Sequence, residues 1–258
     1  MKSLKQYTLP FFVFCVYTIL YIPIIVLVLF SFNKSAYPYN WSGFSLHWYR
    51  ELLQSTDLLH ALYNSLVIAG TSMILSIVLA ALFIFFRPKN KFNNLLPLFY
   101  GGLTAPEVVL AVGLLSLFYF LLVPLGLTTI IAGHTLVGLG YTIPIIQSRF
   151  EELDTRYTEA SMDLGATQMQ TLWHVIIPLL YPALISSGLL VFIVSLDDFV
   201  IAFFTAGAAT QTLPMYIFAT IRAGATPIIN ALSVFLLVVS SLVVLIFSLL
   251  KVNKADML

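Results

Sequence analysis

Charged residues are scarce in this sequence. Asp, Glu, Lys and Arg together make up 9% of its 258 residues, while hydrophobic residues make up 60%. Soluble domains usually carry about 25% charged residues, so the composition excludes an ordinary soluble domain. It predicts a polytopic membrane protein in which lipid surrounds apolar helices. The net charge of +1 gives no indication of nucleic-acid binding.

Several chemical signatures are also absent. The single cysteine, Cys15, excludes an intrachain disulfide. The chain has no Walker glycine loop, no nucleophile triad and no metal-ligand spacing. We therefore expect no catalytic residue, no metal and no bound cofactor, and the chain is not expected to hydrolyse ATP itself.

Six long apolar stretches predict six membrane-spanning helices, over residues 9–32, 61–86, 95–122, 127–147, 179–204 and 228–250. The first is too long for a signal-peptide core of about 7–15 residues and lacks an Ala-x-Ala site, so we interpret it as a retained span. The fold class is thus an all-α membrane protein. With no detectable repeat or low-complexity linker, we expect one domain over residues 1–258.

Five connections of different character join these stretches: residues 33–60 (long and aromatic), 87–94 (short and basic), 123–126 (a tight turn), 148–177 (polar) and 205–227 (mostly uncharged). Thr226 and Pro227 have the residue types of an N-cap and a first helical position, and predict the start of the last span.

The positive charges are distributed unequally between the two sides. Nine of the twelve Lys and Arg residues fall on the side of the termini, and three fall on the other side, namely Lys34, Arg50 and Arg222. Positive charge favours the cytoplasmic side. We therefore expect both termini and the 148–177 connection to be cytoplasmic.

That polar connection also contains apolar residues which contact with water does not explain, among them Leu153, Met169 and Trp173. Such residues indicate a partner. Glycine adopts left-handed backbone conformations freely, so Gly165 is suited to end a short helix over Glu159–Leu164. We expect a second helix from Ala166 and the next span from Pro178, which together predict a helix-turn-helix at the membrane face.

The pattern Glu-Ala-x-x-x-x-Gly, nine residues, then aliphatic-x-aliphatic-Pro resembles the EAA loop of ABC-importer permeases. Ser161 stands where a second Ala is usual, and Val175 and Ile177 replace Ile and Leu. The resemblance implies that this loop docks into a groove of a cytoplasmic ATPase, with the coupling residues Glu159, Ala160, Gly165, Ala166 and Pro178. The alternative is an ordinary amphipathic linker between spans.

Three acidic residues lie within predicted spans. Glu107 falls about 18 Å into the third span, where a carboxylate costs about 2.5–3.5 kcal/mol. Pro106 can kink this span and free carbonyl groups, as in mid-membrane binding sites. Alternatively the span starts later and leaves Glu107 interfacial, or Glu107 pairs with His134. His134 itself we interpret as a packing residue.

Asp197 and Asp198 fall in the fifth span, where neighbouring helical positions point about 100° apart and flank a lumen. The alternative is a helix cap at a span that ends near Ser195. With no Lys or Arg in the spans, the acids indicate a path for a cation or amine. Trp48 could add a cation–π contact, or it could anchor the chain at the membrane interface.

Three further segments are similar to permeases of spermidine/putrescine importers of the PotC type, namely residues 105–111, 195–200 and 213–218. The similarity extends over most of the chain, although Glu107 stands where that family is expected to have Asp. It implies a MetI-like type I ABC permease in the bacterial inner membrane, with a substrate path at Glu107, Asp197, Asp198 and Trp48.

The implied partners are a second permease of PotB type, two ATPase subunits that bind ATP and Mg²⁺, an extracytoplasmic substrate-binding protein and membrane lipid. Two alternatives are an ABC permease for another solute, and a secondary transporter that uses the acids as proton or cation sites. The choice of amine, and whether the partner permease is identical or different, stay open.

Overall fold

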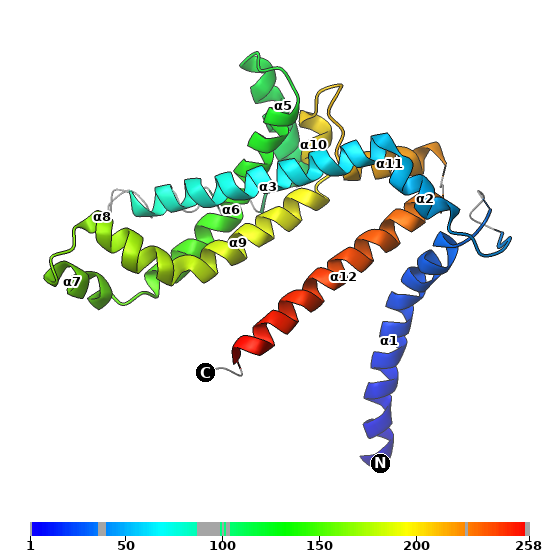
Figure 1. Ribbon diagram of the computed structural model, residues 1–258, viewed down its shortest axis with the longest axis horizontal. Coiled ribbons are helices and arrows are strands. Elements are labelled where there is room, and N and C mark those ends of the chain that lie inside the picture. The colour runs from blue at the N-terminus through cyan, green and yellow to red at the C-terminus, as the bar shows by residue number, and fades with distance from the viewer. Residues whose placement is uncertain are drawn as a thin grey trace. The chain divides into compact units, whose positions relative to one another are not determined.

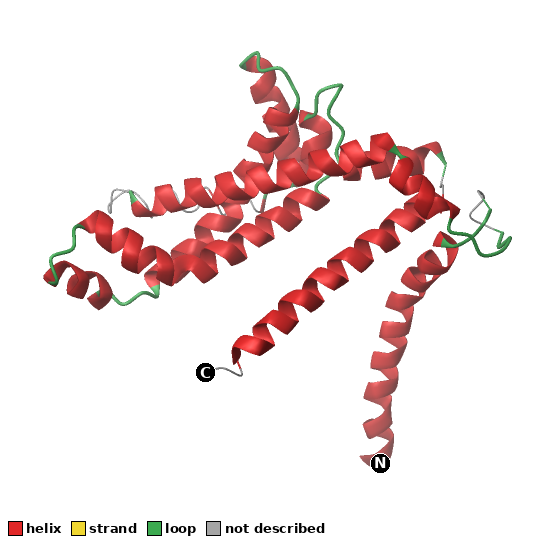
Figure 2. Cartoon of the chain, viewed as in Figure 1, coloured by secondary structure: helices red, strands yellow, loops and turns green. Residues whose placement is uncertain are grey.

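The chain is built from helices (Figure 2). A computed structural model describes residues 2–35, 40–86, 99, 101, 104–224 and 227–255. Within them every named element is a helix, and the isolated bridge between Asn33 and Phe44 is the β-type pairing. This confirms the predicted all-α class.

Contacts divide the chain into two compact units, which are described separately. Unit 1 comprises Met1–Leu59 and Ile217–Leu258, and unit 2 comprises His60–Tyr216. The boundaries fall inside two helices, α3 (Thr56–Phe85) and α11 (Leu213–Ala223). The single domain expected over residues 1–258 stays a prediction, because compact packing alone does not define a domain.

Unit 1 contains two long apolar helices. α1 (Lys2–Ser31) and α12 (Pro227–Ala255) pack against one another, and α12 also packs against the short α2 (His47–Gln54) (Figure 1). The part of α1 over Pro10–Ser31 is long and apolar enough to cross a membrane, and its most apolar stretch has no buried residue. Its apolar surface is therefore available to lipid or to another chain.

The segment after α1 is held by a buried asparagine. Asn33 donates from Nδ2 to the Asn40 carbonyl at 2.7 Å and accepts at Oδ1 from the Ser42 amide at 3.0 Å. The Trp48 indole donates to the Asn33 carbonyl at 2.7 Å. Because buried polar groups need partners, this network fixes a segment that the sequence indicated only as a long aromatic connection.

Unit 2 packs its helices through apolar and small residues. α6 (Leu127–Glu151) lies against α9 (Ile177–Asp197), and the short α10 (Val200–Thr205) lies against both α6 and α5 (Glu107–Phe120). Three clusters fill the core, namely Ala80, Ile84, Ile143 and Ile146; Ile68, Ile130 and Ala202; and Ala111, Leu114, Phe118 and Ile201. Small residues permit such close approach between helices in lipid.

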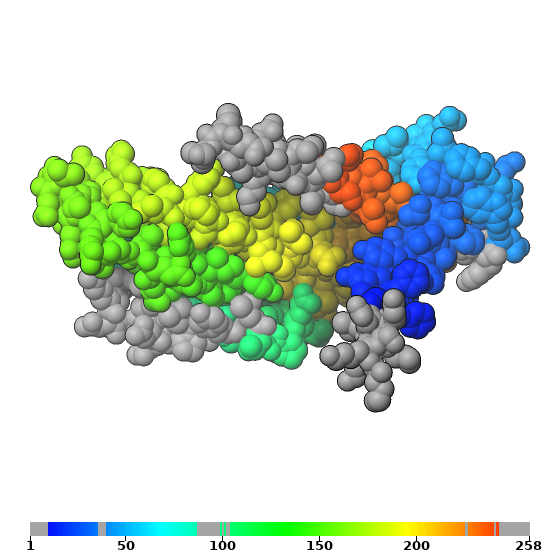
Figure 3. All heavy atoms as spheres, turned by 90° about the horizontal axis from the view of Figure 1, so that it is seen from below, coloured from blue at the N-terminus to red at the C-terminus, as the bar shows by residue number. Residues whose placement is uncertain are grey.

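One end of unit 2 is formed by the polar connection (Figures 1 and 3). It contains α7 (Arg156–Asp163) and α8 (Gln168–Thr171), followed by a π-helical turn (Leu172–Ile176) that continues into α9. The predicted helix-turn-helix is therefore present. α6 extends into this connection as far as Glu151, beyond the predicted end of the fourth span at residue 147.

Four helices among the described residues are long and apolar enough to span a membrane: Pro10–Ser31, Thr56–Phe85, Leu127–Glu151 and Gln168–Asp197. Glu107–Phe120 and Pro227–Val239 are shorter apolar helices. Each of the six predicted spans thus overlaps an apolar helix, although residues 95–98 and the basic 87–94 connection lie outside the described residues.

Two predicted boundaries are wrong. The fifth span was expected over 179–204, but its helix begins within the polar connection, ends at Asp197 and resumes as α10. The 205–227 connection was expected to be a loop, yet it contains α11. Pro227 is the first residue of α12, as predicted, whereas Thr226 lies outside the described residues.

We expect Gly138→Ala to lower the melting temperature of the purified protein. A Cβ atom at this position on α6 would lie 2.9 Å from Val191 Cγ1 and would collide with Ser76, and overpacking costs about 1–3 kcal/mol. Gly70→Ala on α3 is the matched control, because a Cβ atom there meets no atom within 4 Å. Equal melting curves for the two variants would contradict the close packing of α6.

Candidate functional site

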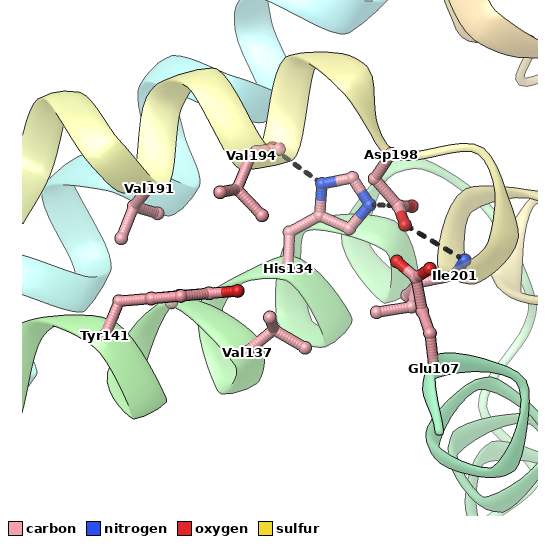
Figure 4. A pocket seen from close by; sticks show the side chains of 10 residues that line it. Glu107, His134, Val137, Tyr141, Val191, Val194, Asp198 and Ile201 are labelled. Carbon is pink, nitrogen blue, oxygen red and sulfur yellow. Dashed lines mark hydrogen bonds and ion pairs between the residues drawn. The ribbon is translucent and has the colours of Figure 1, made fainter. Parts of the chain in front are cut away.

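A small pocket in unit 2 brings together side chains from α5, α6 and α9 and from the link between α9 and α10 (Figure 4). Five of its lining residues carry polar side chains: Glu107, His134, Tyr141, Ser195 and Asp198. Its volume is about 20 Å³, which is room for about one water molecule. The pocket therefore concentrates hydrogen-bonding groups in an otherwise apolar part of the chain.

His134 lies at the centre of this group. Its Nδ1 is 2.6 Å from the Ser195 hydroxyl, and its Nε2 is 2.9 Å from Asp198 Oδ2. Only 2% of the His134 side chain and 5% of the Asp198 side chain are exposed. Since a carboxylate oxygen accepts, Nε2 carries the hydrogen. His134, interpreted from the sequence as a packing residue, is buried as expected, and both of its ring nitrogens have polar hydrogen-bond partners.

Asp198 connects three elements. It follows the last residue of α9 in an extended conformation, and its carboxylate accepts from the Ala202 amide at 2.9 Å and from the Ile201 amide at 3.4 Å. It thereby caps the N-terminus of α10 while it also binds His134 on α6. The capping alternative is correct in kind, although the cap serves α10 and lies beyond Ser195.

Asp197 differs from Asp198 in its exposure to solvent. It is exposed, whereas Asp198 is buried, and it does not line the pocket. The two acids therefore do not flank a lumen as neighbouring helical positions, since the helix ends between them.

Glu107 begins α5 and is exposed. Pro106 precedes it with an extended conformation, so the expected position in the middle of a continuous helix is wrong. The Glu107 side chain lies within hydrogen-bonding reach of Asp198 (Figure 4). The alternative partner, His134, instead binds Ser195 and Asp198.

The arrangement places two carboxyl groups against one small cavity. Such a pair repels when both groups are ionised, and a cation between them or a shared proton relieves the repulsion. None of the lining residues that the structure describes is Lys or Arg. The pocket therefore suits one ammonium-sized group, and in this state it is too small for a whole polyamine.

Trp48 belongs to unit 1 and is not among the described lining residues of this pocket. It is buried in unit 1, where its indole nitrogen is bonded to Asn33. This contact is of the kind expected of an anchoring residue. The role of Trp48 in a substrate path stays a prediction.

The predicted coupling residues lie on the polar connection as expected. Glu159 and Ala160 are exposed on α7, and Pro178 is the second residue of α9. Gly165 has φ +87°, and it donates to the Met162 carbonyl while Ala166 donates to Ser161. This pair of bonds is the Schellman motif, so the predicted role of Gly165 in ending the helix is confirmed.

Other features of the connection were missed. Thr167 and Gln170 form a capping box at the start of α8, and the Thr-x-x-Gln pattern signals it. The Ser161 and Thr171 hydroxyls, 2.9 Å apart, join α7 to the end of α8. Large apolar side chains remain exposed, including Leu164 at 90% and Trp173 at 60%, which agrees with a surface that a partner covers.

A larger cavity of about 380 Å³ lies between this connection and the ends of α3 and α6. Phe85 and Phe150 line one side, and Met162, Met169 and Leu172 line the other. No sequence pattern indicated it, because it is formed by residues from separate helices. It leaves the α7–α8 hairpin with few buried contacts, a feature of elements that move.

Comparisons with known proteins identify the family of the chain. Residues 72–253 match the family described as "Binding-protein-dependent transport system inner membrane component". The chain is 39% identical to the spermidine/putrescine transport system permease protein PotC of Haemophilus influenzae, over 91% of this chain and 93% of that protein.

Two further relatives come from Escherichia coli K12. The chain is 34% identical to its PotC, covering 94% of this chain and 93% of that protein. It is 37% identical to the putrescine transport system permease protein PotI, covering 86% and 82%.

The fold is also similar to a solved structure, a bacterial ABC transporter involved in the import of the acidic polysaccharide alginate. The TM-score is 0.75 at 17% identity, and the match covers 96% of this chain and 95% of that chain. The architecture predicted from the EAA-like loop is thereby confirmed. The chain belongs to the family of binding-protein-dependent transport system inner membrane components, with the MetI-like fold of ABC permeases.

Proposed function

We propose that this chain is the transmembrane permease subunit of an ATP-driven ABC importer that moves a cationic amine, spermidine or putrescine, across the bacterial cytoplasmic membrane. The observation that carries the substrate class is the pair of facing carboxyl groups, Glu107 and Asp198, in a pocket whose described lining residues include no Lys or Arg. The relatives named for spermidine and putrescine support the same class.

The path of the amine comprises Glu107, Asp197, Asp198 and Trp48. A polyamine is a flexible chain with several positive charges, so it can contact separated carboxylates in succession. The present cavity admits one charged group at most. Passage therefore requires the pocket to widen, or to be completed by the partner permease.

The energy for transport comes from other subunits. The sequence has no Walker glycine loop with which to bind nucleotide, so two ATPase subunits bind ATP and Mg²⁺. The coupling residues Glu159, Ala160, Gly165, Ala166 and Pro178 form the docking element for them. A second, related permease and an extracytoplasmic substrate-binding protein complete the importer.

Both termini lie in the cytoplasm. The distribution of Lys and Arg places the polar connection on the same side, where an ATPase subunit docks. This orientation follows from charge alone and is independent of the resemblance in the loop.

We expect Glu107→Gln and Asp198→Asn each to reduce spermidine uptake about tenfold or more, with membrane insertion unchanged. Each change removes a charged acceptor, and bonds to charged groups contribute about 1.5–3 kcal/mol. Asp57→Asn is the matched control, an exposed acid on α3 that does not line the pocket.

The measurement is uptake of labelled spermidine into vesicles that contain the assembled importer. Asp197→Asn is included in a triple neutral variant with the other two changes. Wild-type uptake by that variant eliminates the cationic path and leaves a permease for another solute. Uptake that persists with vanadate-inhibited ATPases would instead indicate a secondary transporter.

We expect Gly165→Val to uncouple ATP hydrolysis from transport. A left-handed conformation costs an L-residue about 1–2 kcal/mol and is disfavoured further by β-branching, so the turn that presents Leu164 is lost. Gly165→Asn is the control, because asparagine tolerates this conformation. Co-purification of the ATPase subunits and substrate-stimulated hydrolysis are measured. Normal assembly and transport by the valine variant would refute the role of the turn.

Cysteine labelling tests the orientation. In a Cys15→Ser background, Gln168→Cys on α8 should react with an impermeant reagent only after the cells are opened, and Ala208→Cys should react in intact cells. Both positions are exposed, so burial does not limit either reaction. Labelling of position 168 in intact cells would overturn the orientation and the docking of an ATPase together.

A further inference from the structure

We propose that His134 is a positioning residue of the transport path. Its imidazole holds the Asp198 carboxylate in the closed pocket, and this leaves Glu107 as the carboxyl group that first meets an ammonium group of the substrate. The inference rests on the proposed function. It assigns different roles to Glu107 and Asp198, which the sequence analysis placed together in one substrate path.

The Asp198 carboxylate is already occupied. A carboxylate has about four acceptor sites, and three N–H donors reach this one: His134 Nε2, the Ala202 amide and the Ile201 amide. The Glu107 carboxyl group also lies within hydrogen-bonding reach of it. The two amides belong to the α10 backbone and stay in place as long as that helix does. The imidazole is therefore the one of these three donors that a substrate can replace without unfolding a helix.

Glu107 has fewer hydrogen-bond donors around its carboxyl group than Asp198 has. It is exposed at the start of α5, and among the described residues no N–H group donates to its carboxylate. Its side chain faces Asp198 across the cavity (Figure 4). An ammonium group that binds Glu107 therefore displaces only the contact between the two carboxyl groups, whereas at Asp198 it must compete with His134 as well.

The competition favours the substrate once it has arrived. A primary ammonium group has three N–H donors and a full positive charge, so it can bond to both carboxyl groups of the pocket and adds a direct charge–charge attraction to each bond. When the ammonium binds Asp198, the His134 ring loses one partner and keeps the Ser195 hydroxyl. His134 thus donates to Asp198 while the path is empty, and the ammonium group replaces this donor when the path is filled.

Two substitutions separate the donor from the shape of the ring. His134→Gln keeps an N–H donor at a similar reach, while His134→Leu keeps bulk and removes the donor. We expect the leucine variant to lower the maximal uptake rate about tenfold, because a bond to a charged group is lost. We expect the glutamine variant to stay within about twofold of wild type. Equal losses in both variants would overturn the proposal, since the donor would then be irrelevant.

A double-mutant cycle in the assembled importer tests whether His134 acts through Asp198. His134→Leu should have no further effect in an Asp198→Asn background, and should keep its full effect in a Glu107→Gln background. The same fold-loss in the Asp198→Asn background as in wild type would overturn the proposal. Asp57→Asn combined with His134→Leu is the control for additivity.

A spectroscopic readout does not depend on uptake. In ¹⁵N spectra of the imidazoles, with the His134 signal assigned through His134→Gln, Asp198→Asn should shift the Nε2 resonance. Putrescine bound to the importer should shift it in wild type and not in Glu107→Gln. If neither Asp198→Asn nor putrescine shifts the Nε2 resonance, the role proposed for His134 is overturned. If the wild-type importer transports no polyamine, the proposed function itself is overturned.

Discussion

A helix that starts inside an apolar unit leaves backbone N–H groups without partners, and lipid offers none. This constraint falls on the link between α9 and α10, where the chain ends one helix at Asp197 and starts the next at Val200. The Asp198 carboxylate satisfies the amides of Ile201 and Ala202. The buried charge needs a further donor in turn, and His134 on α6 provides it. The contact therefore holds three helices together through one carboxylate, and the packing of Ile201 and Ala202 into the core depends on it.

The same contact decides what the pocket can do. Asp198 is bonded by three N–H donors, whereas Glu107 receives no N–H bond from the described residues. Under the proposed function, Glu107 is therefore the carboxyl group that binds the cation first. Under the proposal, Asp198 has two roles: it links helices while the pocket is empty, and it binds the ammonium group when the pocket is filled. Transport needs weak and exchangeable contacts, because a cation held too firmly does not leave. A carboxylate shared between an imidazole and an ammonium group meets that requirement.

Local patterns made the polar connection predictable. Gly165, with the residues around it, specifies a helix end by itself, and Pro227 specifies a helix start. The pocket was harder, because hydropathy does not show where a helix stops within an apolar run. The segment from Phe199 to Thr205 looks like a continuation of the fifth span, so the separation of Asp197 from Asp198 was missed. The contact of His134 with Asp198 joins residues that lie 64 positions apart. Periodicity in the sequence cannot predict such a long-range contact. The helix α11 was missed because its residues resemble those of an uncharged loop.

The polar connection and the pocket are joined by one helix. From Gln168 to Asp197 the chain is continuous over 30 residues, which is about 45 Å at the usual rise. One end carries α8 and the exposed apolar side chains, and the other carries Ser195 and the helix end that positions Asp198. Its irregular positions are the π-helical turn Leu172–Ile176, just before Pro178, and Pro182 inside α9, and both kinds of position are sites where helices bend. If an ATPase subunit docks on the hairpin as proposed, a displacement of the hairpin has a direct mechanical route to Ser195 and Asp198, which contact His134. The cavity beneath α7 and α8 leaves room for that displacement without compression of the core.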